Sequence, residues 1–174
     1  MTSISTLLPT YATVDLTALA HNLSRIKRYL SPGCEVMAIV KANAYGHGSF
    51  EVAQALAKQG VTQFAVASLD EGIALRQAGI TASIVVLGAL FEKQVPDLVA
   101  HRLTPVVSDG PILPTLAKAA LSHPAPYPIH LKVETGMGRL GFSPEELLAL
   151  LDDPILRGPL QVEGLMTHLA DADG

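Results

Sequence analysis

The sequence predicts an α/β protein, a parallel (β/α) barrel of the TIM type that is incomplete, with about six of the eight βα units. Short apolar runs of strand length alternate with helical patterns, which is typical of parallel βα units. The runs are apolar almost throughout, as expected when both faces of a sheet are covered. The chain has 174 residues, whereas a closed eight-stranded barrel needs about 250. A complete open sheet of five or six parallel strands fits the same pattern.

Helices are predicted where apolar residues recur at spacings of three and four. In residues 17–30, Leu19, Leu23, Ile26 and Leu30 form such a face. The clearest helix start is the capping box at 143–146 (SPEE), where proline takes the first helical position. The other predicted helices span residues 49–59, 70–79, 93–101 and 112–121.

The predicted strands lie between these helices. They are residues 35–40 (EVMAIV), 63–68 (QFAVAS), 83–88 (SIVVLG), 103–108 (LTPVVS), 128–134 (PIHLKVE) and 160–168 (LQVEGLMTH). No glycine-rich dinucleotide motif or phosphate loop follows any of them, which argues against a nucleotide-binding sheet.

The composition excludes several functional classes. Charged residues make up 16% of the chain, below the usual ~25%, so intrinsic disorder is not expected. A net charge of −4 and the absence of tryptophan argue against a nucleic-acid surface. The single cysteine, Cys34, excludes an internal disulfide framework, and no residues have metal-ligand spacing. Neither a secretory signal nor an apolar stretch of about 18 residues is found, so the expected compartment is the cytoplasm and no membrane partner is expected.

Lys41 is the leading candidate for chemistry. It ends an apolar strand and shares a strand face with Met37 and Ile39. Desolvation on that face would favour a neutral, nucleophilic amine, and active sites of barrels lie at the carboxyl ends of the strands. A lysine that snorkels to solvent from a strand end explains the same pattern.

The segment around Lys41, residues 40–48 (VKANAYGHG), resembles the pyridoxal-phosphate attachment motif of bacterial alanine racemases. Residues 131–142 (LKVETGMGRLGF) are similar to a second signature of that family. Residues 14–23 resemble its opening segment, and residues 166–170 (MTHLA) resemble its sixth-strand segment. The resemblance implies a pyridoxal-phosphate-dependent isomerase of fold type III. Such an enzyme interconverts L-alanine and D-alanine and supplies D-alanine for peptidoglycan in the cell wall.

The same resemblance implies roles for individual residues. Lys41 would hold pyridoxal 5'-phosphate as an aldimine and act as one of two racemisation bases. Tyr45 would contact the cofactor phosphate, and His168 would stack on its pyridine ring. No metal is implied.

In the second signature, Arg139 would lie near the phenolic oxygen of the cofactor and the carboxylate of the substrate. Met137 would offer a backbone amide near that carboxylate. Lys132 matches a lysine that many members carry as a carbamate. Taken without the resemblance, each of these residues also fits a surface loop or a structural role.

The resemblance covers only the N-terminal part of the family. Residues 1–174 are therefore expected to form an N-terminal cofactor-binding barrel portion without the C-terminal β domain. In the family that domain supplies the opposite-face tyrosine and takes part in the homodimer, so the chain alone is expected to have little or no activity. Two other interpretations stay open, a single-barrel protein of pyridoxal phosphate homeostasis and an inactive racemase fragment.

Overall fold

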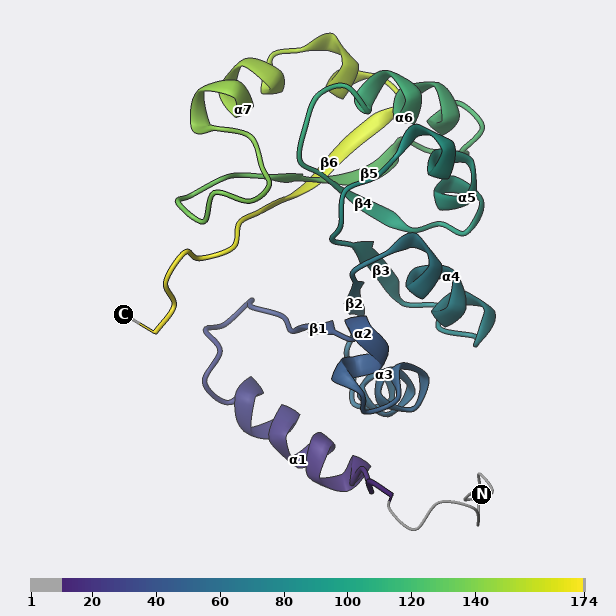
Figure 1. Ribbon diagram of the computed structural model, residues 1–174, viewed down its shortest axis with the longest axis vertical. Helices are drawn as coiled ribbons and strands as arrows, with labels where there is room; N and C mark the ends of the chain where they lie inside the picture. Colours follow the sequence, from purple (N-terminus) through teal and green to yellow (C-terminus); the bar gives the residue numbers. More distant parts are fainter. Residues whose placement is uncertain (1–10, 174) are drawn as a thin grey trace.

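The computed structural model describes residues 11–173, which form a six-stranded sheet with every neighbouring pair parallel. The strands follow one another in chain order, and Figure 1 shows this succession from β1 to β6. Their bounds are β1 Met37–Ile39, β2 Gln63–Val66, β3 Ser83–Val86, β4 Thr104–Val107, β5 Tyr127–Lys132 and β6 Leu160–Met166. The predicted parallel α/β architecture is confirmed.

Helices connect the strands and cover one face of the sheet. Figure 1 shows α4, α5 and α6 on the same side of the strands, with α1 beyond β1. The helices are α1 Leu16–Lys27, α3 Ser49–Lys58, α4 Leu69–Gln77, α5 Val95–Ala100, α6 Leu113–Ala120 and α7 Pro144–Leu151, with short 3-10 turns at η1 Glu92–Gln94 and η2 Pro154–Arg157. The segment labelled α2, Lys41–Tyr45, is a left-handed turn and belongs to the candidate site.

Most predicted helix boundaries agree with the structure within two residues. The capping box of α7 is present, because Ser143 Oγ accepts the Glu146 N–H at 3.2 Å and Glu146 Oε2 accepts the Ser143 N–H at 2.8 Å. Helix α1 ends earlier than expected. The N–H groups of Arg28 and Tyr29 bond to carbonyls three residues back, so the last turn tightens and the helix stops before Leu30.

The hydrophobic core lies between the sheet and the helices. Side chains that alternate along the strands separate into two sets. The larger set faces the helices and includes Phe64, Ile84 and Leu131. A smaller cluster on the other face joins buried side chains of β2, β3 and β4 with Met37 and Met166. This second face is the interior side of the predicted barrel.

Strands β1 and β6 form the two ends of the sheet, as expected for six consecutive units of an incomplete barrel. Ile39 of β1 and Leu165 of β6 are large apolar side chains that stay exposed. Among the residues described, no helix has the length and apolar character needed to cross a membrane.

Candidate active site

Lys41 begins a strained turn at the carboxyl end of β1. The side chain is half-buried, and the next four residues have left-handed backbone conformations. Their φ angles are +50° at Ala42, +55° at Asn43, +52° at Ala44 and +54° at Tyr45. A left-handed conformation costs about 1–2 kcal/mol for each residue with a side chain. Contacts from neighbouring elements must therefore stabilise this turn.

Two side chains supply such contacts. Glu71 of α4 reaches across from the next βα unit, and its Oε1 accepts the Ala42 N–H at 2.7 Å. Its other oxygen, Oε2, accepts the Ala67 N–H at 2.7 Å. At the far end of the turn, Asn43 Oδ1 accepts the Ser49 N–H at 2.8 Å, which joins the turn to the start of α3.

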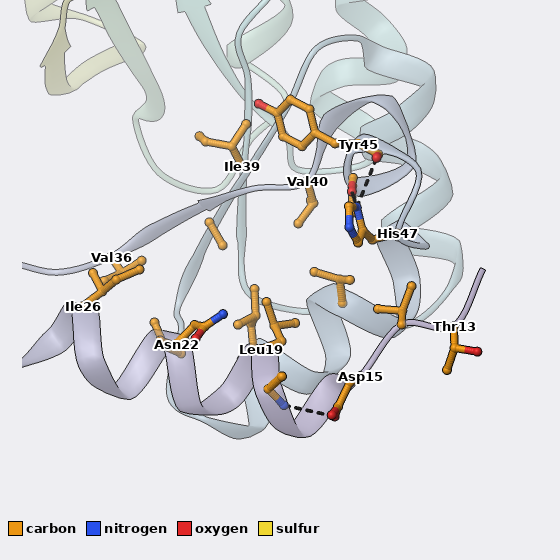
Figure 2. A pocket seen from close by; sticks show the side chains of 17 residues that line it. Thr13, Asp15, Leu19, Asn22, Ile26, Val36, Ile39, Val40, Tyr45 and His47 are labelled. Carbon is orange, nitrogen blue, oxygen red and sulfur yellow. Dashed lines mark hydrogen bonds between the residues drawn. The ribbon is translucent and has the colours of Figure 1, made fainter. Parts of the chain in front are cut away.

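Tyr45 and His47 complete the surroundings of the turn. The Lys41 Nζ atom lies 5.9 Å from the centre of the Tyr45 ring, within reach of a cation–π contact. His47 Nδ1 lies 2.9 Å from the Ala44 carbonyl oxygen and 3.1 Å from the Tyr45 carbonyl oxygen. In Figure 2 the dashed lines at His47 mark these two contacts, and the Tyr45 ring points away from α1.

A cavity of about 540 Å³ lies beside this turn, between α1 and β1. Figure 2 shows Leu19 and Ile26 of α1 facing Val36 and Val40 across it. Ile39 and Tyr45 line the cavity, whereas Lys41, which lies between them in sequence, does not. The Lys41 amine is therefore not part of the cavity wall.

The loop after β5 is closed at its base. The Phe142 N–H donates to the Lys132 carbonyl at 2.8 Å, and the Glu134 N–H donates to the Phe142 carbonyl at 2.9 Å. Gly141 has a φ of +130°, and a Cβ atom there would lie 2.7 Å from the Glu134 nitrogen. A glycine is needed here because the loop returns directly over the end of β5.

Glu134 organises the inside of the same loop. Its carboxylate accepts the Gly136 N–H at 2.6 Å and the Arg139 N–H at 3.0 Å. The backbone N–H groups of Gly138, Arg139 and Gly136 lower the pKa of Glu134 to about 2. Glu134 is therefore ionised at neutral pH and holds the loop that carries Met137 and Arg139.

Lys132, the last residue of β5, lies at the base of this loop. The residue is only 7% exposed. Burial lowers the pKa of Lys132, and the nearby Arg139 guanidinium lowers it further, while Glu134 opposes the shift. Both main causes favour the neutral amine.

The loop after β6 is tied to the loop after β5. The Thr135 and Thr167 hydroxyl oxygens are 2.6 Å apart, and Thr167 Oγ1 also donates to the Val133 carbonyl at 3.0 Å. The second bond fixes Thr167 against the end of β5. His168 directly follows Thr167 and is exposed.

The structure thus brings four of the candidate residues together. Lys132, Met137, Arg139 and His168 line one depression with Glu134 at the carboxyl ends of β5 and β6. The other two, Lys41 and Tyr45, follow β1, the outer strand on the other side of the sheet. Since all strands are parallel, both groups lie along the edge that is formed by the carboxyl ends of the strands. The residues described contain no group of three metal-ligating side chains.

Sequence reasoning missed two acidic residues that organise these loops. The pattern Ser68-x-x-Glu71 is a capping-box signature, so it could have identified Glu71 as the start of a helix but not its bond to Ala42. Glu134 had no such signal, because a glutamate after a strand usually faces solvent.

Comparisons with known proteins give a consistent result. Residues 14–174 match the family model described as "Alanine racemase, N-terminal domain". An alanine racemase of Desulforamulus reducens is 40% identical over 166 residues, which cover 95% of this chain and 45% of that protein. The chain therefore spans less than half the length of this relative.

Solved structures show the same likeness. An alanine racemase of Clostridium difficile 630 has a TM-score of 0.89 and 34% identity, over 97% of this chain and 44% of that chain. An alanine racemase of Bartonella henselae, described with covalently bound pyridoxal phosphate, has a TM-score of 0.81 and 26% identity, over 91% of this chain and 46% of that chain. The fold and the matched residues together show that the chain belongs to the alanine racemase family, within its N-terminal domain.

Proposed function

We propose that the protein carrying this chain interconverts L-alanine and D-alanine, with pyridoxal phosphate bound through Lys41. The observation that carries the proposal is the position of Lys41, a half-buried amine at the carboxyl end of β1 that starts a strained turn. Strain of this kind gathers at functional sites, where surrounding contacts maintain it. The Bartonella henselae relative, described with the cofactor bound covalently, supports the same choice of cofactor.

The residues present fit such a cofactor. Lys41 provides a primary amine at the carboxyl end of β1, and the Tyr45 ring lies next to it. The other lysine at this edge, Lys132, is almost fully buried beneath the loop after β5 and is less accessible to a ligand. We therefore assign the cofactor amine to Lys41, the phosphate contact to Tyr45 and the ring contact to His168.

The remaining roles concern the substrate and its proton. Pyridoxal phosphate, when bound, supplies the electron sink that makes removal of the α-proton possible. Lys41 would take or return that proton at the α-carbon, as one of two bases. Arg139 would bind the substrate carboxylate through its guanidinium, and the Met137 backbone would lie beside it.

We also propose that Lys132 is carbamylated. Its lowered pKa favours the neutral amine, which attacks carbon dioxide to form an N–C bond and releases one proton. The product is an anion, and it removes the repulsion between two cations at Lys132 and Arg139. An anion at this position could accept hydrogen bonds from the Arg139 guanidinium.

The cellular role and the assembly follow from the family alone. The product D-alanine would enter peptidoglycan synthesis in the cytoplasm, and the complete enzyme would be a homodimer.

A direct assay tests the proposed function. The protein that carries this chain should form D-alanine from L-alanine when saturated with pyridoxal phosphate. Lys41→Ala should lower the rate by at least about 10²–10⁴, the usual effect of losing one proton-transfer group. The matched control is Lys58→Ala, since Lys58 is exposed on α3. D-alanine formation by Lys41→Ala at the rate of the Lys58→Ala protein would rule the proposal out.

A further inference from the structure

The carboxylate of Glu71 makes a contact that its helix does not require. In a capping box, the acidic side chain needs one oxygen to accept the N–H of the residue before the helix. Glu71 Oε2 already makes this bond, since it lies 3.3 Å from the Ser68 nitrogen and 2.7 Å from the Ala67 nitrogen. The second oxygen, Oε1, bonds instead to Ala42, which lies 29 residues away in sequence.

Helix α7 provides an internal comparison. Its capping box also joins a serine to a glutamate, with Glu146 Oε2 accepting the Ser143 N–H at 2.8 Å. Glu146 is exposed, and among residues 11–173 its side chain bonds only within its own capping box. The contact to a neighbouring unit is therefore a property of Glu71 and not of the motif.

The bond acts directly on Lys41. The Ala42 N–H belongs to the peptide unit that begins at the Lys41 carbonyl, and peptide units are planar. Holding this N–H fixes the orientation of the plane and with it the ψ angle of Lys41. The direction in which the Lys41 side chain leaves the backbone depends on that angle.

The same bond joins two strand ends. Ala42 follows β1, whereas Ala67 and Ser68 follow β2, and one carboxylate contacts all three N–H groups. The contact to Ala42 holds the first residue of a turn of four left-handed residues. We infer that Glu71 is a positioning residue that holds the turn after β1 and so sets the direction of the Lys41 amine. The inference rests on the proposed function only for the role of Lys41.

The informative substitution is Glu71→Gln. Glutamine keeps one oxygen for the capping box, but the NH2 group that replaces the second oxygen is a donor and cannot accept the Ala42 N–H. The control is Glu146→Gln, which makes the same change in the capping box of α7.

Hydrogen exchange measures the contact without any cofactor. In the unsubstituted protein, the Ala42 amide should exchange far more slowly than in an unfolded chain, although Ala42 itself is exposed. Glu71→Gln should speed exchange at Ala42 by about tenfold or more, and Glu146→Gln should leave it unchanged. Unprotected Ala42 in the unsubstituted protein overturns the inference, even if the variant fails to fold.

The second readout is pyridoxal phosphate itself, titrated by absorbance at several pH values. We expect Glu71→Gln to weaken binding about 10–100-fold and to move the pH midpoint of the bound spectrum, because a misdirected amine meets the cofactor in a different geometry. Glu146→Gln should change neither. If Glu71→Gln and Glu146→Gln bind pyridoxal phosphate equally well and give the same spectra, Glu71 is not a positioning residue. Absence of binding in the unsubstituted protein contradicts the proposed function instead, while the exchange result still decides the role of Glu71.

Discussion

The carboxylate of Glu134 accepts a hydrogen bond from the backbone N–H of Arg139, with Oε2 3.0 Å from the backbone nitrogen. The acidic residue therefore acts on the peptide backbone and not on the guanidinium, which stays exposed. The Lys132 amine lies beneath the same loop. A single carboxylate thus shapes the loop while the arginine side chain remains available for a ligand.

This contact predicts a specific dependence of stability on pH. The pKa of Glu134 is lowered to about 2 in the folded protein, from a usual value near 4.5. Its stabilising effect is therefore complete above about pH 4.5 and is lost as the pH falls toward 2. Glu134→Gln should lower stability at neutral pH and remove this part of the acid dependence, as measured by urea unfolding between pH 2 and pH 7.

The matched control is Glu145→Gln, since Glu145 is exposed in the first turn of α7. This variant should keep the acid dependence of the unsubstituted protein. If the Glu134→Gln and Glu145→Gln proteins show the same pH profile, the carboxylate of Glu134 does not stabilise its loop.

The buried hydroxyl of Tyr127 should stabilise the fold at a place away from the candidate site. The ring is 1% exposed at the start of β5, and its hydroxyl lies 2.8 Å from the Leu103 carbonyl oxygen and 3.1 Å from that of Leu98. Tyr127→Phe leaves these buried carbonyls without that donor and should cost about 1–2 kcal/mol in urea unfolding. Tyr29→Phe, at a residue that is 81% exposed, should cost nothing measurable. Equal stability of the two variants would show that the buried hydroxyl contributes little.

Much of the fold could be predicted because local patterns and tertiary packing agree. The apolar face of α1 and the capping box of α7 each specify an element through interactions within a few residues. The predicted strands extend a little beyond the observed ones. Residues such as Ala67 and Glu134 continue the apolar or extended pattern, but their N–H groups bond to Glu71 and to the Phe142 carbonyl instead of a neighbouring strand.

The turn after Lys41 could not be predicted from local preferences. Alanine and tyrosine disfavour left-handed conformations, which glycine adopts without strain. The structure instead places Ala42 to Tyr45 in that region. The stabilising contacts come from Glu71 and Ser49, which lie outside the turn, so only the folded arrangement reveals them.

We expect the Lys132 amine to be modified as a carbamate. Incubation with ¹³C-bicarbonate should give a carbamate carbon signal in the protein that carries this chain, because the buried amine has a lowered pKa and lies near Arg139. Lys132→Arg should remove the signal, since a guanidinium does not form a carbamate under these conditions. Lys118→Arg, on α6, serves as the control and should retain the signal. A carbamate signal that persists in Lys132→Arg would place the modification on another lysine.

Lys41 predicts where the cofactor attaches. Borohydride reduction in the presence of pyridoxal phosphate should fix the label on the peptide that contains Lys41, as found by mass spectrometry. The competing amine at this edge of the sheet is Lys132, but it is 7% exposed and lies beneath the closed loop after β5. Lys41→Arg keeps the positive charge and removes the primary amine, so the label should disappear and not move to Lys132. A label on Lys132 in the unsubstituted protein, with Lys41 unmodified, would assign the cofactor to the other end of the sheet.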